Sequence, residues 1–224
     1  MSDNLLDEAI RKQVSEVFAD LKENVEILYF GTDGDCETCS DTQQLLEEVT
    51  GLSDKLTLSV YELEKNADIA QRYRVDKTPG IVIAAKEDQT IIDYGIRYAG
   101  IPSGHEFSSL INDLVLVSGR DSGLAPETRA KLKEISQPVF MQVFVTPTCP
   151  YCPRAVVLAH QMAMENPFIQ AEMVEAMEFP ELSERFGVSG VPQTTINEGA
   201  GTVVGAVPEA NLLAEILQAT NPNH

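Results

Sequence analysis

Two copies of one cysteine motif, separated by half of the chain, constrain this sequence more than any other feature. The chain of 224 residues has four cysteines, in C-E-T-C at 36–39 and in C-P-Y-C at 149–152. In each half a proline, Pro79 or Pro192, follows the first cysteine after 43 positions, so both features repeat at a distance of 113 residues. Three further pairs keep this spacing without a gap: Arg72 and Arg185, Tyr73 and Phe186, Val75 and Val188. The sequence is therefore an internal duplication.

The duplication predicts two domains of about 110 residues each, which is a usual domain size. Upstream of the motifs the match continues, because apolar residues 27–30 fall on residues 140–143, and both stretches are predicted strands. A stretch with two glycines and a closing proline marks a linker over 119–126. We therefore expect an N-terminal unit over residues 1–118 and a C-terminal unit over residues 127–224.

Both halves have the same predicted order of helices and strands. A helix precedes the first strand, the C-x-x-C motif opens a second helix, a strand and a short helix follow, and the proline precedes a hairpin and a last helix. The ranges predicted for the first half after its first helix are 25–31, 36–50, 56–61, 65–74, 80–85, 90–95 and 104–118. Those for the second half are 139–145, 149–165, 168–174, 179–186, 193–197, 202–206 and 208–219. This order indicates an α/β fold in which each unit has a mixed central sheet flanked by helices.

The spacing of the cysteines favours redox chemistry over three other uses. A disulfide within C-x-x-C closes too short a loop to stabilise a fold substantially. Two C-x2-C pairs are also a zinc-ligand pattern, but zinc ribbons separate the pairs by about 15–20 residues, and an iron–sulfur cluster meets the same difficulty. Two buried structural thiol pairs stay open as an interpretation. Chance pairing at one spacing is improbable, so we favour a dithiol that is oxidised and reduced.

The charge of the chain limits the classes of partner that it is expected to bind. Sixteen Lys and Arg against 35 Asp and Glu give a net charge of -19, which disfavours binding to nucleic acid and to anionic membranes. No apolar run approaches the roughly 20 residues of a spanning helix, and the first residues lack the basic and apolar regions of a signal peptide. No G-x-G-x-x-G motif occurs. We therefore expect a cytoplasmic protein that binds no cofactor.

A strand, a C-x-x-C motif at a helix start and a Thr-Pro or Val-Pro about 40 residues later resemble the thioredoxin superfamily. Two such units in one chain are similar to the cytoplasmic protein disulfide oxidoreductases, also called glutaredoxin-like proteins. The most specific stretch is T-C-P-Y-C-P-R-A-V-V-L-A-H at 148–160, and the resemblance covers essentially the whole chain. It implies two tandem thioredoxin folds that reduce, form or isomerise disulfides in client proteins. It also implies electrons from a separate thioredoxin-reductase-type flavoprotein.

The resemblance assigns the two cysteines of the second motif different roles. It implies that Cys149 is the exposed nucleophile and that Cys152 resolves the mixed disulfide which Cys149 forms with a client. We expect the amino end of the helix to stabilise the Cys149 thiolate, with Pro150 at the first helical position. Tyr151 either packs or belongs to the recognition surface, and we include it with Pro150 among the expected substrate-binding residues.

The two later prolines have an implied role in binding clients. In the thioredoxin fold this proline is cis and lies beside the active-site sulfurs, and a cis peptide is realistic almost only before proline. The resemblance implies that the residue before it pairs through its backbone with an extended client. The expected binding residues are therefore Val191 with Pro192 and Thr78 with Pro79.

The two sites are not equal in charge. Four carboxylates lie within five positions of Cys36, at 33, 35, 37 and 41, whereas residues 140–159 contain none. Negative neighbours disfavour a thiolate, so we expect a higher pKa for Cys36 than for Cys149. We predict that Cys149 and Cys152 carry most exchange with protein clients. The roles left open for Cys36 and Cys39 are electron relay, action on other partners, isomerisation, and a structural or decayed site.

Two departures limit the resemblance. Thioredoxins have a buried Asp about six positions before the motif, where this chain has Phe30 and Val143, so deprotonation of the resolving cysteines needs another group or water. The Gly-Gly and acidic pattern with which glutaredoxins bind glutathione is missing from residues 204–209, which puts glutathione in doubt. His160 is expected to be a surface or packing histidine rather than a proton carrier.

Two alternative functions stay open. One is a dedicated dithiol electron donor to a peroxiredoxin, similar to the tandem N-terminal unit of alkyl hydroperoxide reductase flavoproteins, although two retained C-x-x-C pairs favour the broader role. The other is a non-catalytic C-x-x-C metal-binding module. Our expectation is an enzyme without a metal site.

Overall fold

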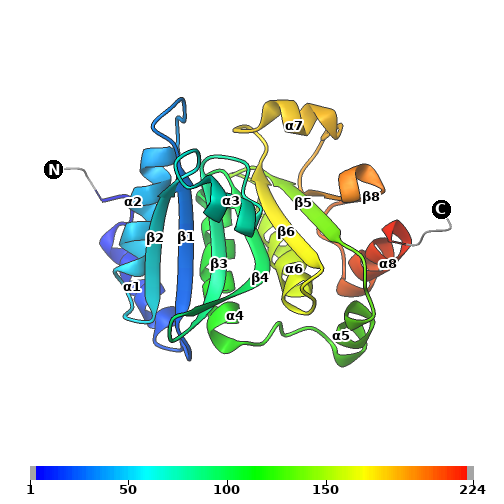
Figure 1. Cartoon of the computed structure of the whole chain (residues 1–224), viewed down its shortest axis with the longest axis horizontal. Coiled ribbons are helices and arrows are strands. Elements are labelled where there is room, and N and C mark those ends of the chain that lie inside the picture. Colours follow the sequence, from blue (N-terminus) through cyan, green and yellow to red (C-terminus); the bar gives the residue numbers. More distant parts are fainter. Residues whose placement is uncertain (1–3, 221–224) are drawn as a thin grey trace.

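The computed structural model describes residues 4–220, and within them eight strands form one mixed sheet in the order β2-β1-β3-β4-β6-β5-β7-β8 (Figure 1). The strands are β1 (Val25–Gly31), β2 (Leu56–Glu62), β3 (Gly80–Glu87), β4 (Thr90–Ala99), β5 (Val139–Val145), β6 (Ile169–Glu175), β7 (Gln193–Ile196) and β8 (Gly201–Val204). The α-helices are α1 (Glu8–Phe18), α2 (Cys39–Thr50), α3 (Ala67–Tyr73), α4 (Phe107–Gly119), α5 (Pro126–Lys133), α6 (Cys152–Met164), α7 (Pro180–Arg185) and α8 (Glu209–Ala219). Two 3-10 helices are η1 (Gly104–Glu106) and η2 (Asn197–Gly199).

The strand pairing repeats from one half to the other. In the first half β1 pairs in parallel with β2 and antiparallel with β3, which pairs antiparallel with β4. In the second half β5 pairs in parallel with β6 and antiparallel with β7, which pairs antiparallel with β8. The predicted α/β fold with a mixed sheet in each half is therefore confirmed. The halves join where β4 pairs in parallel with β6, so the sheet runs through both of them.

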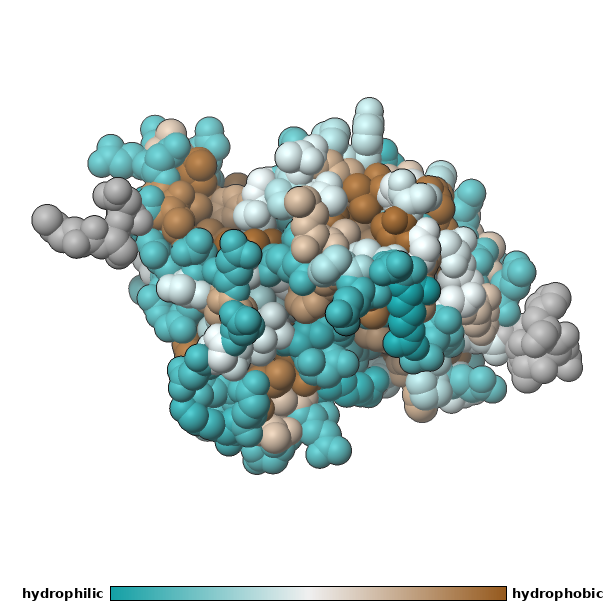
Figure 2. Space-filling view, turned by 90° about the horizontal axis from the view of Figure 1, so that it is seen from above, coloured by the Kyte–Doolittle hydropathy of each residue, from teal (hydrophilic) through white to brown (hydrophobic). Residues whose placement is uncertain are grey.

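The direction of the strands brings both cysteine motifs to one edge of the sheet. Since β1 and β4 are both antiparallel to β3, β4 is parallel to β6, and β6 is parallel to β5, β1 and β5 run in the same direction. Each C-x-x-C motif follows the carboxyl end of one of these two strands. The motifs therefore lie at the upper edge in Figure 1. Figure 2 views this edge and shows hydrophobic residues gathered in separate groups over the two halves.

Helices cover both faces of the sheet. The largest hydrophobic cluster extends over both halves on the face of α2, α4 and α6, with Leu46, Leu114 and Val156 fully buried. On the other face, which is nearer the viewer in Figure 1, α3 and α7 cover two smaller clusters around Tyr73 and Phe186. None of the helices among residues 4–220 is long and apolar enough to cross a membrane.

The repeat has one more residue in the first half than the gapless match predicted. Upstream of the motifs β1 starts at Val25 and β5 at Val139, an offset of 114 rather than 113. Tyr29 and Val143, which are 114 apart, both belong to the large cluster. Side chains alternate between the two faces of a strand. The predicted match of 27–30 with 140–143 is shifted by one residue, so it would pair residues whose side chains lie on opposite faces of the sheet. The extra residue lies in the loop between β1 and Cys36.

Several predicted boundaries were displaced by contacts between the halves. β4 was expected to end at residue 95, but it continues to Ala99 because Ile96–Ala99 pair with β6 of the second half. Of the segment 119–126, which we expected to be a linker, Gly119 is the last residue of α4 and Pro126 the first residue of α5. Pro126 is tolerated at the first turn of α5, because an N–H there has no partner within the helix.

Candidate active site

Each C-x-x-C motif forms a disulfide within itself. The Cα atoms of Cys36 and Cys39 lie 5.5 Å apart, and those of Cys149 and Cys152 are separated by the same distance. The prediction that each motif's first cysteine opens the helix was wrong, because α2 begins at Cys39 and α6 at Cys152. In both motifs the first cysteine therefore belongs to the turn that precedes the helix.

The prolines around the second motif also differ from the prediction. Pro150 lies in the turn before α6 and not at the first helical position. Pro153 is the second residue of α6, within the first turn, where the missing N–H breaks no bond of the helix. A proline after the second cysteine is therefore compatible with a regular helix.

The amino end of α6 is directed at the sulfur of Cys149. The backbone N–H of Cys152 donates to Cys149 Sγ at 3.2 Å, and the carbonyl oxygen of Val191 lies 3.8 Å from the same sulfur. Cys149 keeps 8% of its surface exposed and Cys152 none, so Cys149 is the more accessible residue of the pair, though it is far less exposed than we expected. An N–H donor at a helix terminus stabilises a thiolate.

Both later prolines follow cis peptide bonds, as the resemblance implied. Thr78-Pro79 and Val191-Pro192 are cis, and both prolines are buried. The carbonyl oxygen of Pro192 accepts a hydrogen bond from Gly205 at 2.8 Å, which joins the proline to the end of the following hairpin. Val191 stays partly exposed, so its backbone lies at the surface beside Cys149.

Tyr151 lies at the surface of the second motif. It is 68% exposed, which is inconsistent with a packing role. Residues 139–160 contain one Lys or Arg, Arg154, which follows Tyr151 by three positions. The stretch around the second motif therefore carries an exposed aromatic residue and one arginine, in contrast to the acidic stretch around Cys36.

A segment of the first half packs against the loop that carries Cys149. The backbone N–H of His105 in η1 donates to the carbonyl oxygen of Pro147 at 2.9 Å. Gly104 has a φ of +59°, and a Cβ at this position would lie 2.3 Å from that same oxygen. Glycine is therefore required at position 104 for the two backbones to approach each other this closely.

Replacing Gly104 by alanine should destabilise the protein by about 2–4 kcal/mol, because a Cβ there collides with backbone and φ is positive. Urea unfolding of the oxidised protein measures this loss. Gly119→Ala is the matched control, because a Cβ at Gly119 meets nothing within 4 Å and the residue ends α4, so the free energy of unfolding should change by less than about 1 kcal/mol. Equal effects of the two changes would contradict the role assigned to Gly104.

The segment also contains a buried carboxyl group, that of Glu106. Glu106 is 1% exposed, its Oε2 accepts a hydrogen bond from Ser109 Oγ at 2.6 Å, and its Oε1 has no hydrogen-bond partner among the described residues. Burial raises the pKa of Glu106 from its ordinary value of 4.5 to about 7. Sequence reasoning missed this residue, because it belongs to the other half and follows no motif.

His160 of α6 is buried. Of the two expected positions, at the surface or packed in the interior, the structure shows the second. Its Nδ1 lies 2.6 Å from Asp113 Oδ2 and its Nε2 lies 3.2 Å from the carbonyl oxygen of Arg97. The hydroxyl of Tyr98 donates to the same oxygen of Asp113. These buried groups tie α6 of the second half to α4 and β4 of the first half.

The first motif has different surroundings. Tyr29 donates its hydroxyl hydrogen to the carbonyl oxygen of Cys39 at 2.7 Å, and burial raises the pKa of Tyr29 to about 12. Asp33, one of the four flanking carboxylates, forms an ion pair with Lys65 at 2.8 Å, and this hydrogen bond lowers the pKa of Asp33. Thr38, between the cysteines, donates its hydroxyl hydrogen to Glu178 of the second half.

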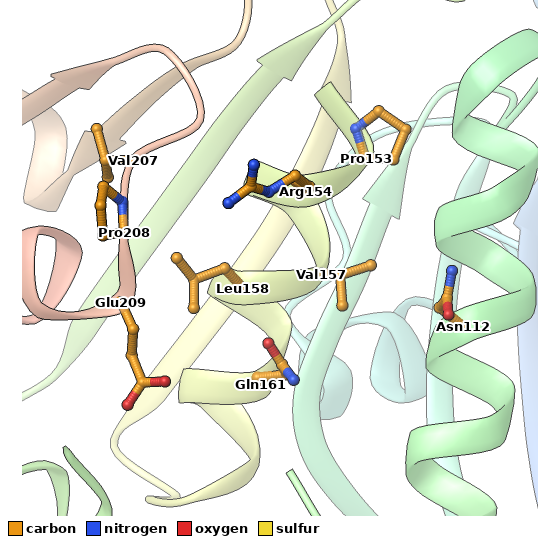
Figure 3. A pocket seen from close by; sticks show the side chains of 9 residues that line it. All are labelled: Asn112, Pro153, Arg154, Val157, Leu158, Gln161, Val207, Pro208 and Glu209. Carbon is orange, nitrogen blue, oxygen red and sulfur yellow. The ribbon is translucent and has the colours of Figure 1, made fainter. Parts of the chain in front are cut away.

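A cavity of about 390 Å³ opens beside the first turns of α6 (Figure 3). It is lined by Asn112, Pro153, Arg154, Val157, Leu158, Gln161, Val207, Pro208 and Glu209. The side chain of Arg154 extends from α6 toward the segment before α8. No cysteine lines this cavity, so it adjoins the second motif without enclosing it.

The comparisons with known proteins agree with this geometry. The thioredoxin domain family matches residues 140–218, which contain the second motif. The crystal structure of a protein disulfide oxidoreductase from Aeropyrum pernix k1 is 32% identical in sequence to this chain, with a TM-score of 0.88. The match covers 97% of this chain and 95% of the other. The chain belongs to the thioredoxin-like protein disulfide oxidoreductases.

Further similar proteins are a domain of an alkylhydroperoxide reductase and two longer curated proteins. The NTD_N/C domain of the alkylhydroperoxide reductase AhpF from Enterococcus faecalis (V583) is 28% identical, with a TM-score of 0.85, and the match covers 94% of this oxidoreductase and 99% of that domain. The F component of the alkyl hydroperoxide reductase of Staphylococcus aureus is 27% identical over 86% of this chain and 34% of its own. A Bacillus subtilis (strain 168) protein named NADH dehydrogenase is 27% identical over 97% of this chain and 39% of its own. The oxidoreductase thus spans little more than a third of the length of these curated relatives.

The metal-binding alternative can be compared with the grouping of possible ligands among the described residues. Among residues 4–220 no three side chains of His, Cys, Asp or Glu lie together as they would around a metal ion. The two cysteine pairs follow β1 and β5, which are separated in the sheet by β3, β4 and β6. The four sulfurs therefore do not form one tetrahedral site.

Proposed function

We propose that this oxidoreductase exchanges disulfides with client proteins mainly through Cys149 and Cys152. The observation that carries the proposal is the N–H of Cys152 at 3.2 Å from Cys149 Sγ, because it favours the thiolate at the more accessible residue of the pair. The partly exposed backbone of Val191 beside that sulfur is suited to pair with an extended client. Thr78 and Pro79 would do the same at the first motif.

The reductive reaction moves two electrons from the cysteine pair to the client. The Cys149 thiolate attacks a client disulfide, one S–S bond forms as the client S–S bond breaks, and the released client sulfur takes up a proton. Cys152 then loses its proton and attacks Cys149 Sγ in the mixed disulfide. This step forms the Cys149–Cys152 disulfide and releases the second client thiol. The reverse sequence oxidises a client dithiol.

Glu106 is the candidate base for the second of these steps. Its side chain is buried, one of its oxygens has no partner among the described residues, and its pKa of about 7 lets it accept and return a proton near neutral pH. The hydrogen bond between His105 and Pro147 holds its segment against the loop that carries Cys149. Glu106 would thus replace the buried Asp that this sequence lacks.

We also propose that Cys36 and Cys39 pass electrons between a flavoprotein reductase and the second pair. The likeness to the F component of alkyl hydroperoxide reductase, a protein about three times as long as the matched region, supports a larger reductase as electron source. The same likeness favours a second candidate function, in which the main client is a peroxiredoxin. The two candidates share one chemistry and differ in the client. We keep the boundaries 1–118, 119–126 and 127–224 as the proposed units.

The test uses the reduced full-length chain, freed of excess reductant, with insulin as the client. We expect two insulin thiols per oxidised Cys149–Cys152 pair and a trapped Cys149–client disulfide in the Cys152→Ser variant. The same experiment with a peroxiredoxin disulfide compares the rates. A much higher rate with the peroxiredoxin would favour the dedicated donor, whereas bound stoichiometric zinc with no thiol release from either client would overturn both functions.

A further inference from the structure

A carboxylate of the second half, Glu178, contacts the first cysteine motif. It lies in the loop between β6 and α7. Its Oε2 accepts a hydrogen bond from the hydroxyl of Thr38, the residue just before Cys39, and its Oε1 accepts one from the backbone N–H of Ile101 at 2.7 Å. One side chain thus joins the turn between the two cysteines to the segment after β4.

The two contacts of Glu178 connect it to the two parts expected to form the first site, the C-x-x-C turn and the cis proline. Thr38 is the N-cap residue of α2, where a threonine hydroxyl commonly accepts a bond from the helix, yet its side chain makes no such cap. Its hydroxyl is instead bound to Glu178. Ile101 follows Gly100, whose N–H donates to the carbonyl oxygen of Pro79 at 2.9 Å. Glu178 therefore bridges the C-x-x-C turn and the segment that holds the cis proline.

The position of Glu178 is fixed by its own surroundings. Its backbone N–H donates to Glu175 Oε2 at 2.7 Å, and Glu175 is a buried residue at the end of β6. Gly100 has a φ of +95°, and a Cβ there would lie 2.7 Å from Glu175 Cβ and 2.8 Å from Glu178 Oε1. Only glycine leaves room for the carboxylate in this place.

The second motif has no equivalent of this contact among the described residues. The residue that matches Thr38 in the repeat is Tyr151, which is 68% exposed and has no hydroxyl group near its backbone. The residue that matches Glu178 is Lys65, which forms ion pairs with Asp33 and Glu62 within the first half. The bridge is therefore a property of the first site alone.

We propose that Glu178 is a positioning residue of the first redox site, which holds the turn between Cys36 and Cys39 through Thr38 and makes the reduction potential of this pair depend on the second half. The inference rests on the proposed function only in requiring that Cys36 and Cys39 can be reduced.

The physical reason is the charge that reduction creates. Reduction of the disulfide takes up two electrons and two protons, and one of the two thiols then ionises more readily than the other. A carboxylate next to the turn disfavours that thiolate and so disfavours the reduced form. It also occupies the Thr38 hydroxyl, which could otherwise donate to a sulfur anion. Removal of the charge should therefore stabilise the reduced pair and make its potential less negative.

The experiment measures the reduction potential of the first pair in full-length protein with Cys149 and Cys152 replaced by serine. Equilibration with mixtures of reduced and oxidised dithiothreitol, followed by acid quench and thiol alkylation, gives the potential. For Glu178→Gln we expect a threefold to tenfold increase in the equilibrium constant for reduction, which corresponds to roughly 14–30 mV. The pH at which Cys36 reacts half-maximally with iodoacetamide should fall in the same variant.

Glu181→Gln is the matched control, because it removes the same charge from an exposed position three residues further along. It should leave the potential within about 5 mV of the parent. In a Thr38→Val background the effect of Glu178→Gln should shrink, since the bond that transmits it is gone. A reducible pair with an unchanged potential in Glu178→Gln, or equal shifts in both glutamine variants, would overturn this inference alone. A first pair that no dithiol reduces would overturn the proposed relay as well.

Discussion

Replacement of Cys149 by serine should lower the initial rate of insulin reduction at least about 100-fold, because the change removes the attacking sulfur that lies beside Val191. The rate is measured with the full-length chain under a constant supply of dithiothreitol, after subtraction of the rate with dithiothreitol alone. Circular dichroism should be unchanged, since serine is nearly isosteric with cysteine.

Cys36→Ser is the matched comparison for this result. It should retain more than about half of the rate with dithiothreitol as the reductant, which can reach the second pair directly. With a flavoprotein reductase as the only electron source, the same variant should lose most of its activity if the first pair relays electrons. Equal losses from Cys36→Ser and Cys149→Ser with dithiothreitol would refute the predicted difference between the two sites.

Glu106→Gln should change the way stability depends on pH. Burial raises the pKa of Glu106 in the folded protein to about 7, above its ordinary value of 4.5, so the folded state binds this proton more tightly than the unfolded state. The resulting stabilisation is fully present below pH 4.5 and is lost as the pH rises through about 7. Relative to the glutamine variant, the wild type should therefore lose about 3 kcal/mol of unfolding free energy between about pH 4 and about pH 8.

Urea unfolding of both oxidised proteins across this range measures the difference. The subtraction is needed because other carboxyl groups titrate as well, and Glu26 and Asp93, whose pKa values are lowered, change stability in the opposite direction. Ser109→Ala is a useful companion, because it removes the hydrogen bond to Glu106 and should raise the pKa of that carboxyl further. Parallel stability curves for wild type and Glu106→Gln would show that the carboxyl ionises normally.

The sequence was sufficient to predict the main strands and the fold of each half taken by itself. The ranges of β1 and β5 agree with the predicted 25–31 and 139–145, because continuous apolar runs bounded by polar turns define buried strands. The pairing of cysteine and proline at a fixed distance, through its resemblance to the thioredoxin superfamily, predicted two thioredoxin folds. The same repeat, however, hid the extra residue before Cys36, since apolar strands match one another at several registers.

The sequence could not predict what one half supplies to the other. The last residues of β4 pair with β6, Gly104 approaches Pro147, and Glu178 contacts the first motif, so each of these features is a contact between the halves. None of these residues belongs to a motif, and each is ordinary when read within its own half. A duplicated sequence predicts two copies of a fold, but the asymmetry between the copies comes from how they are joined.

The continuous sheet constrains how electrons can pass from one cysteine pair to the other. Four strand-to-strand steps separate β1 from β5 in the sheet. At about 4.8 Å for each step, the strands that precede the two motifs lie roughly 19 Å apart. Exchange of a disulfide requires two sulfur atoms to touch, and hydrogen-bonded strands cannot fold together to bring them into contact. An electron pair that enters at Cys36 must therefore travel to Cys149 on a visiting thiol, either from a mobile arm of a partner or from a second copy of this chain.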